Sequence, residues 1–135
     1  MNARIGYVLL KGILVWLAII AAETIHGILR GLFLTPYLGD MPARQIGVLI
    51  GSLLIFVIAF LTARRIAGRA KELLLIGAVW CLLTVIFEVG LGRAVGLPWE
   101  RILSDYDLRA GGMMIFGLLF MLIAPYLSAR LRGLV

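Results

Sequence analysis

Four long apolar stretches, separated by short polar segments, form the main pattern of this 135-residue chain. A transmembrane helix needs about 20 mainly apolar residues to cross a hydrocarbon core of ~30 Å. We therefore predict an all-α, polytopic membrane protein whose four transmembrane helices form a compact bundle in a single domain, residues 1–135. The expected helices cover about residues 5–30, 46–63, 72–91 and 111–131.

The connections differ in length and chemistry. The first, LTPYLGDMPARQ, contains two prolines and a Gly-Asp pair, which predict turns and a short outer loop. The third is the longest, and within it Trp99, Ile102, Leu103 and Tyr106 recur with helical spacing. We predict a short amphipathic helix over about residues 98–107, lying in the outer interface between the third and fourth helices. Chance periodicity in an irregular loop is the alternative.

Composition agrees with membrane insertion. Hydrophobic residues make up 63% of the chain and charged residues 15%, against ~45–50% apolar residues in soluble domains. The net charge of +6 comes from basic residues that flank apolar segments rather than from a continuous basic patch, so nucleic acid is not expected as a partner. Eight of the 13 basic residues fall on the side that holds both termini. The positive-inside rule then places the N- and C-termini in the cytoplasm, the opposite orientation being the alternative.

Ionisable residues interrupt two of the apolar stretches, and such residues in a membrane segment indicate a functional site. Glu23, His26 and Arg30 share one face of the first helix, and Glu88 lies on the third. With the first helix entering the membrane at about Tyr7 and the third at about Glu72, both glutamates are 16 residues beyond the inner ends, which predicts a similar depth. We therefore expect the two polar faces to meet, with Arg30, Arg93 or His26 available to pair with a carboxylate.

Three functions could use this cluster. In the leading hypothesis the chain is a non-enzymatic binding or accessory protein, and the ligand or proton site candidates are Glu23, His26, Arg30, Glu88 and Arg93. The second is an oligomeric proton-linked transporter or channel for a small solute. The third is a metal site, because Glu23-x-x-His26 has the spacing of di-iron helix bundles and Glu88 could add a ligand.

The sequence gives no support to catalysis, because it contains no Walker loop, no CxxC pair and no Ser-His-Asp order. No catalytic residue is assigned, and no cofactor is required, although a divalent metal is one candidate. The expected partners are membrane lipid and a second copy or a larger membrane complex. Candidates for an outer lid over the cluster are Trp99, Arg101, Asp105, Tyr106 and Asp107. Trp16 and Trp80 fall near mid-depth, where we expect ordinary packing.

Three segments resemble those of small four-helix bacterial inner-membrane proteins that have no assigned activity. The segments are HGILR around His26, FEVGLGR around Glu88, and PWERILSDYDL from Pro98 to Leu108. The resemblance implies the same topology and a bacterial inner (cytoplasmic) membrane location. It assigns no activity and no site residues.

Overall fold

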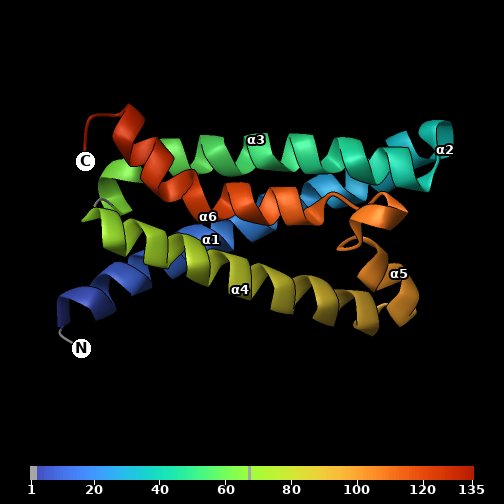
Figure 1. The fold of residues 1–135 in the computed structure, drawn as a ribbon, viewed down its shortest axis with the longest axis horizontal. Coiled ribbons are helices and arrows are strands. Elements are labelled where there is room, and N and C mark those ends of the chain that lie inside the picture. The colour runs from blue at the N-terminus through green and yellow to red at the C-terminus, as the bar shows by residue number, and fades with distance from the viewer. Residues whose placement is uncertain (1–2, 67) are drawn as a thin grey trace.

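A computed structural model describes residues 3–66 and 68–135, and within these residues all the secondary structure is helical, with no strand (Figure 1). In chain order the elements are α1 (Ala3–Leu29), the π-helical turn η1 (Arg30–Leu34), α2 (Thr35–Leu38), α3 (Asp40–Ile66), α4 (Ala70–Ala94), α5 (Trp99–Ser104), the 3-10 turn η2 (Leu108–Ala110) and α6 (Met114–Leu131). Both termini lie at one end of the molecule, the terminal end, and α2 and α5 lie at the other, the lid end (Figure 1).

Four helical stretches are long and apolar enough to cross a membrane, which confirms that prediction. They cover Ala3–Leu38, Asp40–Ile66, Ala70–Ala94 and Met114–Leu131. In each of them only 28% of the most apolar window is buried inside the chain. Most of the apolar surface therefore faces outward, as expected of a multi-pass membrane protein and not of a soluble monomer.

The first connection is not the loop that we predicted. The first helix continues through η1 and α2 to Leu38, and α3 begins at Asp40, so that Gly39 alone separates them. Both prolines sit in the first turn of a helix, Pro36 in α2 and Pro42 in α3. The N–H groups of a first turn have no partner inside the helix, so proline is tolerated there. The chain reverses at Gly39, whose φ of 87° suits glycine.

Helices α1 and α4 run parallel in a fixed register. Three side-chain contacts join residues 68 positions apart: Arg4 to Glu72 at 2.9 Å, the indole of Trp80 to the carbonyl of Gly12 at 2.8 Å, and the indole of Trp16 to Thr84 Oγ1 at 3.0 Å. Both tryptophans thus donate a buried hydrogen bond, in addition to the packing that we predicted.

The apolar core lies in the half of the bundle nearer the terminal end. Every buried residue of α1 precedes Glu23, and these are Val8, Gly12, Trp16, Ile19 and Ile20. Trp80 and Met121 complete the same cluster from α4 and α6. Towards the lid end the packing of α1 is looser, and its polar residues begin there.

Gly77 allows α4 to lie against α6. A Cβ atom at this position would overlap the backbone carbonyl of Leu122, whereas at Gly90, also in α4, it would meet nothing within 4 Å. Small residues permit such close helix contacts in membranes.

Replacing Gly77 with alanine should destabilise the bundle. Overlap with a backbone atom has to be relieved by helix displacement, which costs about 1–3 kcal/mol. The matched variant Gly90→Ala should be neutral or stabilising by up to ~1 kcal/mol, because alanine favours the helix. Thermal unfolding in detergent measures both. Equal midpoints for the two variants would show that α4 and α6 are not in this close contact.

Candidate functional site

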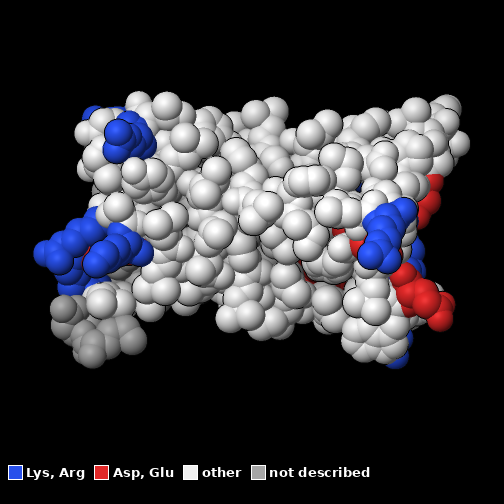
Figure 2. All heavy atoms as spheres, viewed as in Figure 1, with Lys and Arg blue, Asp and Glu red and all other residues white. Residues whose placement is uncertain are grey.

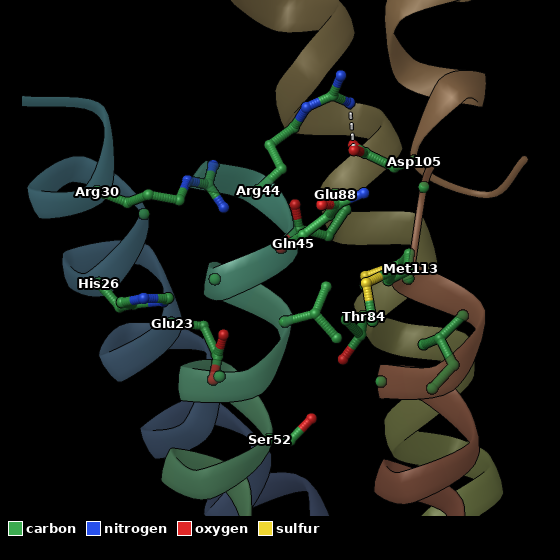
Figure 3. Close-up of a pocket in the computed structure, with 18 of the residues that line it drawn as sticks. Glu23, His26, Arg30, Arg44, Gln45, Ser52, Thr84, Glu88, Asp105 and Met113 are labelled. Atoms are coloured by element: carbon green, nitrogen blue, oxygen red, sulfur yellow. Dashed lines mark hydrogen bonds and ion pairs between the residues drawn. The ribbon is translucent and has the colours of Figure 1, made fainter. Parts of the chain in front are cut away.

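The polar face of the first span lies against α3, and its residues share one cavity with Glu88 of α4, the residue that we expected them to meet. Glu23 lies over Gly51 and Arg30 lies over Gly47 (Figure 3). A Cβ atom at Gly51 would lie 2.7 Å from Glu23 Oε2, and one at Gly47 would lie 3.0 Å from Arg30 Cδ. The two glycines of α3 therefore make the space that the charged side chains of α1 occupy.

Three polar side chains, two in α1 and one at the start of η1, lack partners. Within residues 3–66 and 68–135, the side chains of Glu23, His26 and Arg30 make no hydrogen bond or ion pair, and two of their atoms, Glu23 Oε1 and His26 Nε2, are buried. The predicted pairing of Glu23 with Arg30 is therefore wrong. A buried polar atom without a partner costs about 1–3 kcal/mol, so these groups are available to a ligand.

A cavity of about 330 Å³ lies where these side chains point. Helices α1, α3, α4 and α6 surround it, and the lid end closes it (Figure 3). Its charged and polar lining is Glu23, Thr24, His26, Arg30, Arg44, Gln45, Ser52, Thr84, Glu88 and Asp105. A second cavity of about 380 Å³, between α1, α4 and the lid end, shares Arg30 and Glu88 with the first.

Glu88 enters the cavity from α4 (Figure 3). Its side chain is accessible in both cavities, and within the described residues it too makes no ion pair, so its predicted pairing with an arginine is wrong. No three His, Cys, Asp or Glu side chains of the described chain are placed to hold a metal ion. The predicted metal set of Glu23, His26 and Glu88 does not form, because the first two lie against α3 while Glu88 comes from α4.

A closed ring of four charges fastens the lid end. Arg44 pairs with Asp105 at 2.5 Å and with Asp40 at 3.1 Å, and Arg101 pairs with each of the same carboxylates at 3.4 Å. We call Asp40, Arg44, Arg101 and Asp105 the lid ring. It joins α3 to α5 and to the turn after α5, and Gln45 adds a 2.8 Å hydrogen bond to the carbonyl of Gly111.

The other predicted lid residues have separate roles. Ile102 is the buried residue of α5, whose helix ends at Ser104 and not near residue 107. Tyr106 lines the second cavity, where burial and the carboxylates of Glu88 and Asp105 raise its pKa to about 12. Asp107 accepts a hydrogen bond from the backbone N–H of Arg109.

Arg93, predicted to belong to the polar cluster, lines neither cavity. It donates to the carbonyl of Leu97, and its guanidinium lies 4.9 Å from the centre of the Trp99 ring. Trp99 likewise lies outside both cavity linings. The Arg93–Trp99 contact joins the end of α4 to the first residue of α5.

Five residues at the site were not among the predicted site residues: Asp40, Arg44, Gln45, Gly47 and Gly51. Their signals were present in the sequence. Asp40 and Arg44 are four residues apart, as are Arg101 and Asp105, a spacing that pairs opposite charges on a helix. The glycines are also four apart, a spacing that permits close approach of helices in membranes.

No protein-family model, curated protein or solved structure matches this chain.

Charge balance describes what the cavity can bind. The two acids and two arginines of the lid ring cancel. Of the remaining charged groups, Glu23 and Glu88 are acidic and Arg30 is basic. When both carboxylates are ionised and His26 is neutral, the cavity therefore carries one negative charge in excess. The lining suits a ligand that carries one positive charge and donates hydrogen bonds.

Breaking the lid ring should loosen the lid. Asp105→Asn removes one of the two carboxylates of the ring, and the loss of a charged hydrogen bond to the mostly buried Arg44 costs about 1–2 kcal/mol. Hydrogen–deuterium exchange of residues 95–113 should become about 5–30-fold faster. Glu100→Gln, at an exposed position outside the ring, is the matched control. Unchanged exchange in Asp105→Asn would mean that the ring does not hold the lid.

Proposed function

We propose that this chain is a non-enzymatic, multi-pass binding protein of a bacterial inner membrane, whose cavity binds a solute bearing a primary ammonium group. The observation that carries the proposal is the buried Glu23 Oε1, which has no protein partner at the wall of a 330 Å³ cavity where His26 Nε2 and Arg44 Nε also lack partners. In a membrane an unsatisfied polar group is costly, and a bound donor removes that cost.

The choice of an ammonium group follows from donors and charge. A carboxylate oxygen accepts hydrogen bonds and cannot donate them, so Glu23 requires an N–H or O–H group. A single positive charge also neutralises the excess of Glu23 and Glu88 over Arg30. The cavity volume falls in the range of small-molecule sites, about 300–1,000 Å³.

Binding is favoured over transport by the packing below the cavity. Trp16, Trp80 and Met121 belong to the core cluster that fills the terminal half of the bundle. A transported solute would have to displace this core, whereas a bound solute stays above it. The transporter hypothesis would therefore need a second conformation or an oligomeric path.

Neutralising Glu23 should abolish ammonium binding. In phosphatidylcholine nanodiscs we expect calorimetry to detect butylammonium binding to the unaltered protein, and Glu23→Gln to weaken it at least 10-fold. Tetramethylammonium, which has the charge but no N–H group, should bind at least 10-fold more weakly than butylammonium. The control is Glu100→Gln, which keeps the cavity intact. Absence of butylammonium binding to the unaltered protein contradicts the proposed function.

The charge distribution supports an orientation with cytoplasmic termini. Lys and Arg gather at the terminal end, Asp and Glu join them at the lid end, and the visible surface between is uncharged (Figure 2). By the positive-inside rule the basic end is cytoplasmic. A reporter enzyme that is active only outside the inner membrane should be inactive when fused after Val135, and active when inserted at Gly96. The reverse pattern would invert the proposed orientation.

A further inference from the structure

Helices α1 and α4 are joined at the terminal half but separate towards the lid end. Their last shared hydrogen bond is between Trp16 and Thr84. Beyond it α1 is held by α3, through the contacts of Glu23 and Arg30 with the glycines of α3. The second cavity, about 380 Å³, lies between the separated segments.

This second cavity is apolar on its sides and charged where it joins the first. Ile28, Leu91, Val95, Leu97 and Ile102 form its apolar lining. The two cavities share Thr24, Ile28, Arg30, Glu88, Leu91, Asp105 and Met114. A single molecule with a polar end and an apolar end could therefore occupy both.

The entrance to this cavity lies on the apolar side of the bundle. Ile28 is 57% exposed and Leu91 is 42% exposed on membrane-spanning helices, and Val95, 66% exposed, follows the last residue of α4. The lid ring and the Gln45–Gly111 hydrogen bond fasten the lid end, which is the side nearest water. A ligand that arrives from the lipid layer would not have to open this ring.

Arg30 adds a second requirement to the ligand. It lines both cavities, and its guanidinium makes no ion pair within the described residues. Guanidinium groups bind phosphate through paired N–H donors. The site thus offers a cation for a phosphate and, from Glu88 and Glu23, carboxylates for an ammonium group.

We propose that the natural ligand is a membrane phospholipid whose headgroup carries both a phosphate and a primary ammonium. Its phosphate lies at Arg30, its ammonium reaches Glu88 and Glu23, and its chains leave the protein between α1 and α4 past Ile28 and Leu91. This inference rests on the proposed ammonium site and adds the phosphate, the apolar chains and the route of entry.

Lipid competition tests the inference. The protein is equilibrated with equal amounts of phosphatidylethanolamine, phosphatidylcholine and phosphatidylglycerol, and retained lipid is identified by native mass spectrometry. We expect phosphatidylethanolamine to be retained at least 10-fold over the others, because phosphatidylcholine lacks N–H donors and phosphatidylglycerol lacks the ammonium. Free phosphoethanolamine, the headgroup without chains, should compete at least 10-fold more weakly than the lipid.

Matched variants test the route. Ile28→Trp fills the entrance and should reduce phosphatidylethanolamine retention at least 5-fold. Ile25→Trp is the control, since Ile25 is 60% exposed on the same helix and lines neither cavity. Leu91→Trp and Ile86→Trp repeat the comparison on α4, where Ile86 is 60% exposed and also lines neither cavity. Thermal midpoints confirm that all four variants fold.

Equal retention of the three lipids would overturn the inference, and so would equal retention by both members of each tryptophan pair when all are folded. Free phosphoethanolamine binding as tightly as the lipid would also overturn it, since the chains would then contribute nothing. In each case butylammonium binding that depends on Glu23 would leave the proposed function standing. Loss of that binding in the unaltered protein would instead remove the proposed function itself.

Discussion

Two buried indole hydrogen bonds determine how the rest of the bundle is arranged. Trp16 and Trp80 attach α1 to α4 through Thr84 and the Gly12 carbonyl, and both bonds lie in the terminal half. With the helices parallel and fixed there, their lid-end halves are free to separate. The apolar core fills the joined half, and the two cavities occupy the separated half. The proposed binding function thus rests on the half of the four helices that does not hold the packed core.

The chemistry of the separated half depends on residues that lack side chains. Gly47 and Gly51 let Glu23, His26 and Arg30 fold over α3 instead of reaching into lipid. Larger residues on α3 would collide with Glu23 and Arg30, and uncovered charges in lipid cost at least ~2.5–3.5 kcal/mol each. The glycines therefore contribute to the site although they offer no functional group.

Hydropathy alone was sufficient to predict the four helical stretches, because spanning helices are set by length and apolar content. It failed at the first connection, since prolines at Pro36 and Pro42 fit a helical first turn as well as a loop. Helical spacing correctly grouped Glu23 with His26 and Arg30 on one face. Which helix that face would meet depends on the tilt and rotation of α1, which the Trp16 and Trp80 contacts fix and which no local pattern encodes. The lid ring likewise joins residues about 60 positions apart.

The chain reverses at a single residue, Gly39, and this short connection makes one part of the lid end stiffer than the other. Only Gly39 separates α2 from α3, so α1 through α3 form a hairpin. Its two arms cannot move apart at this end unless a helical turn unwinds. The segment from Val95 to Met113 contains only two short helical pieces, so the connection from α4 to α6 at this end is longer and less regular. Opening of the cavity at the lid end would therefore displace the end of α4 and the lid, and break the lid ring, against a hairpin that carries Glu23, His26 and Arg30.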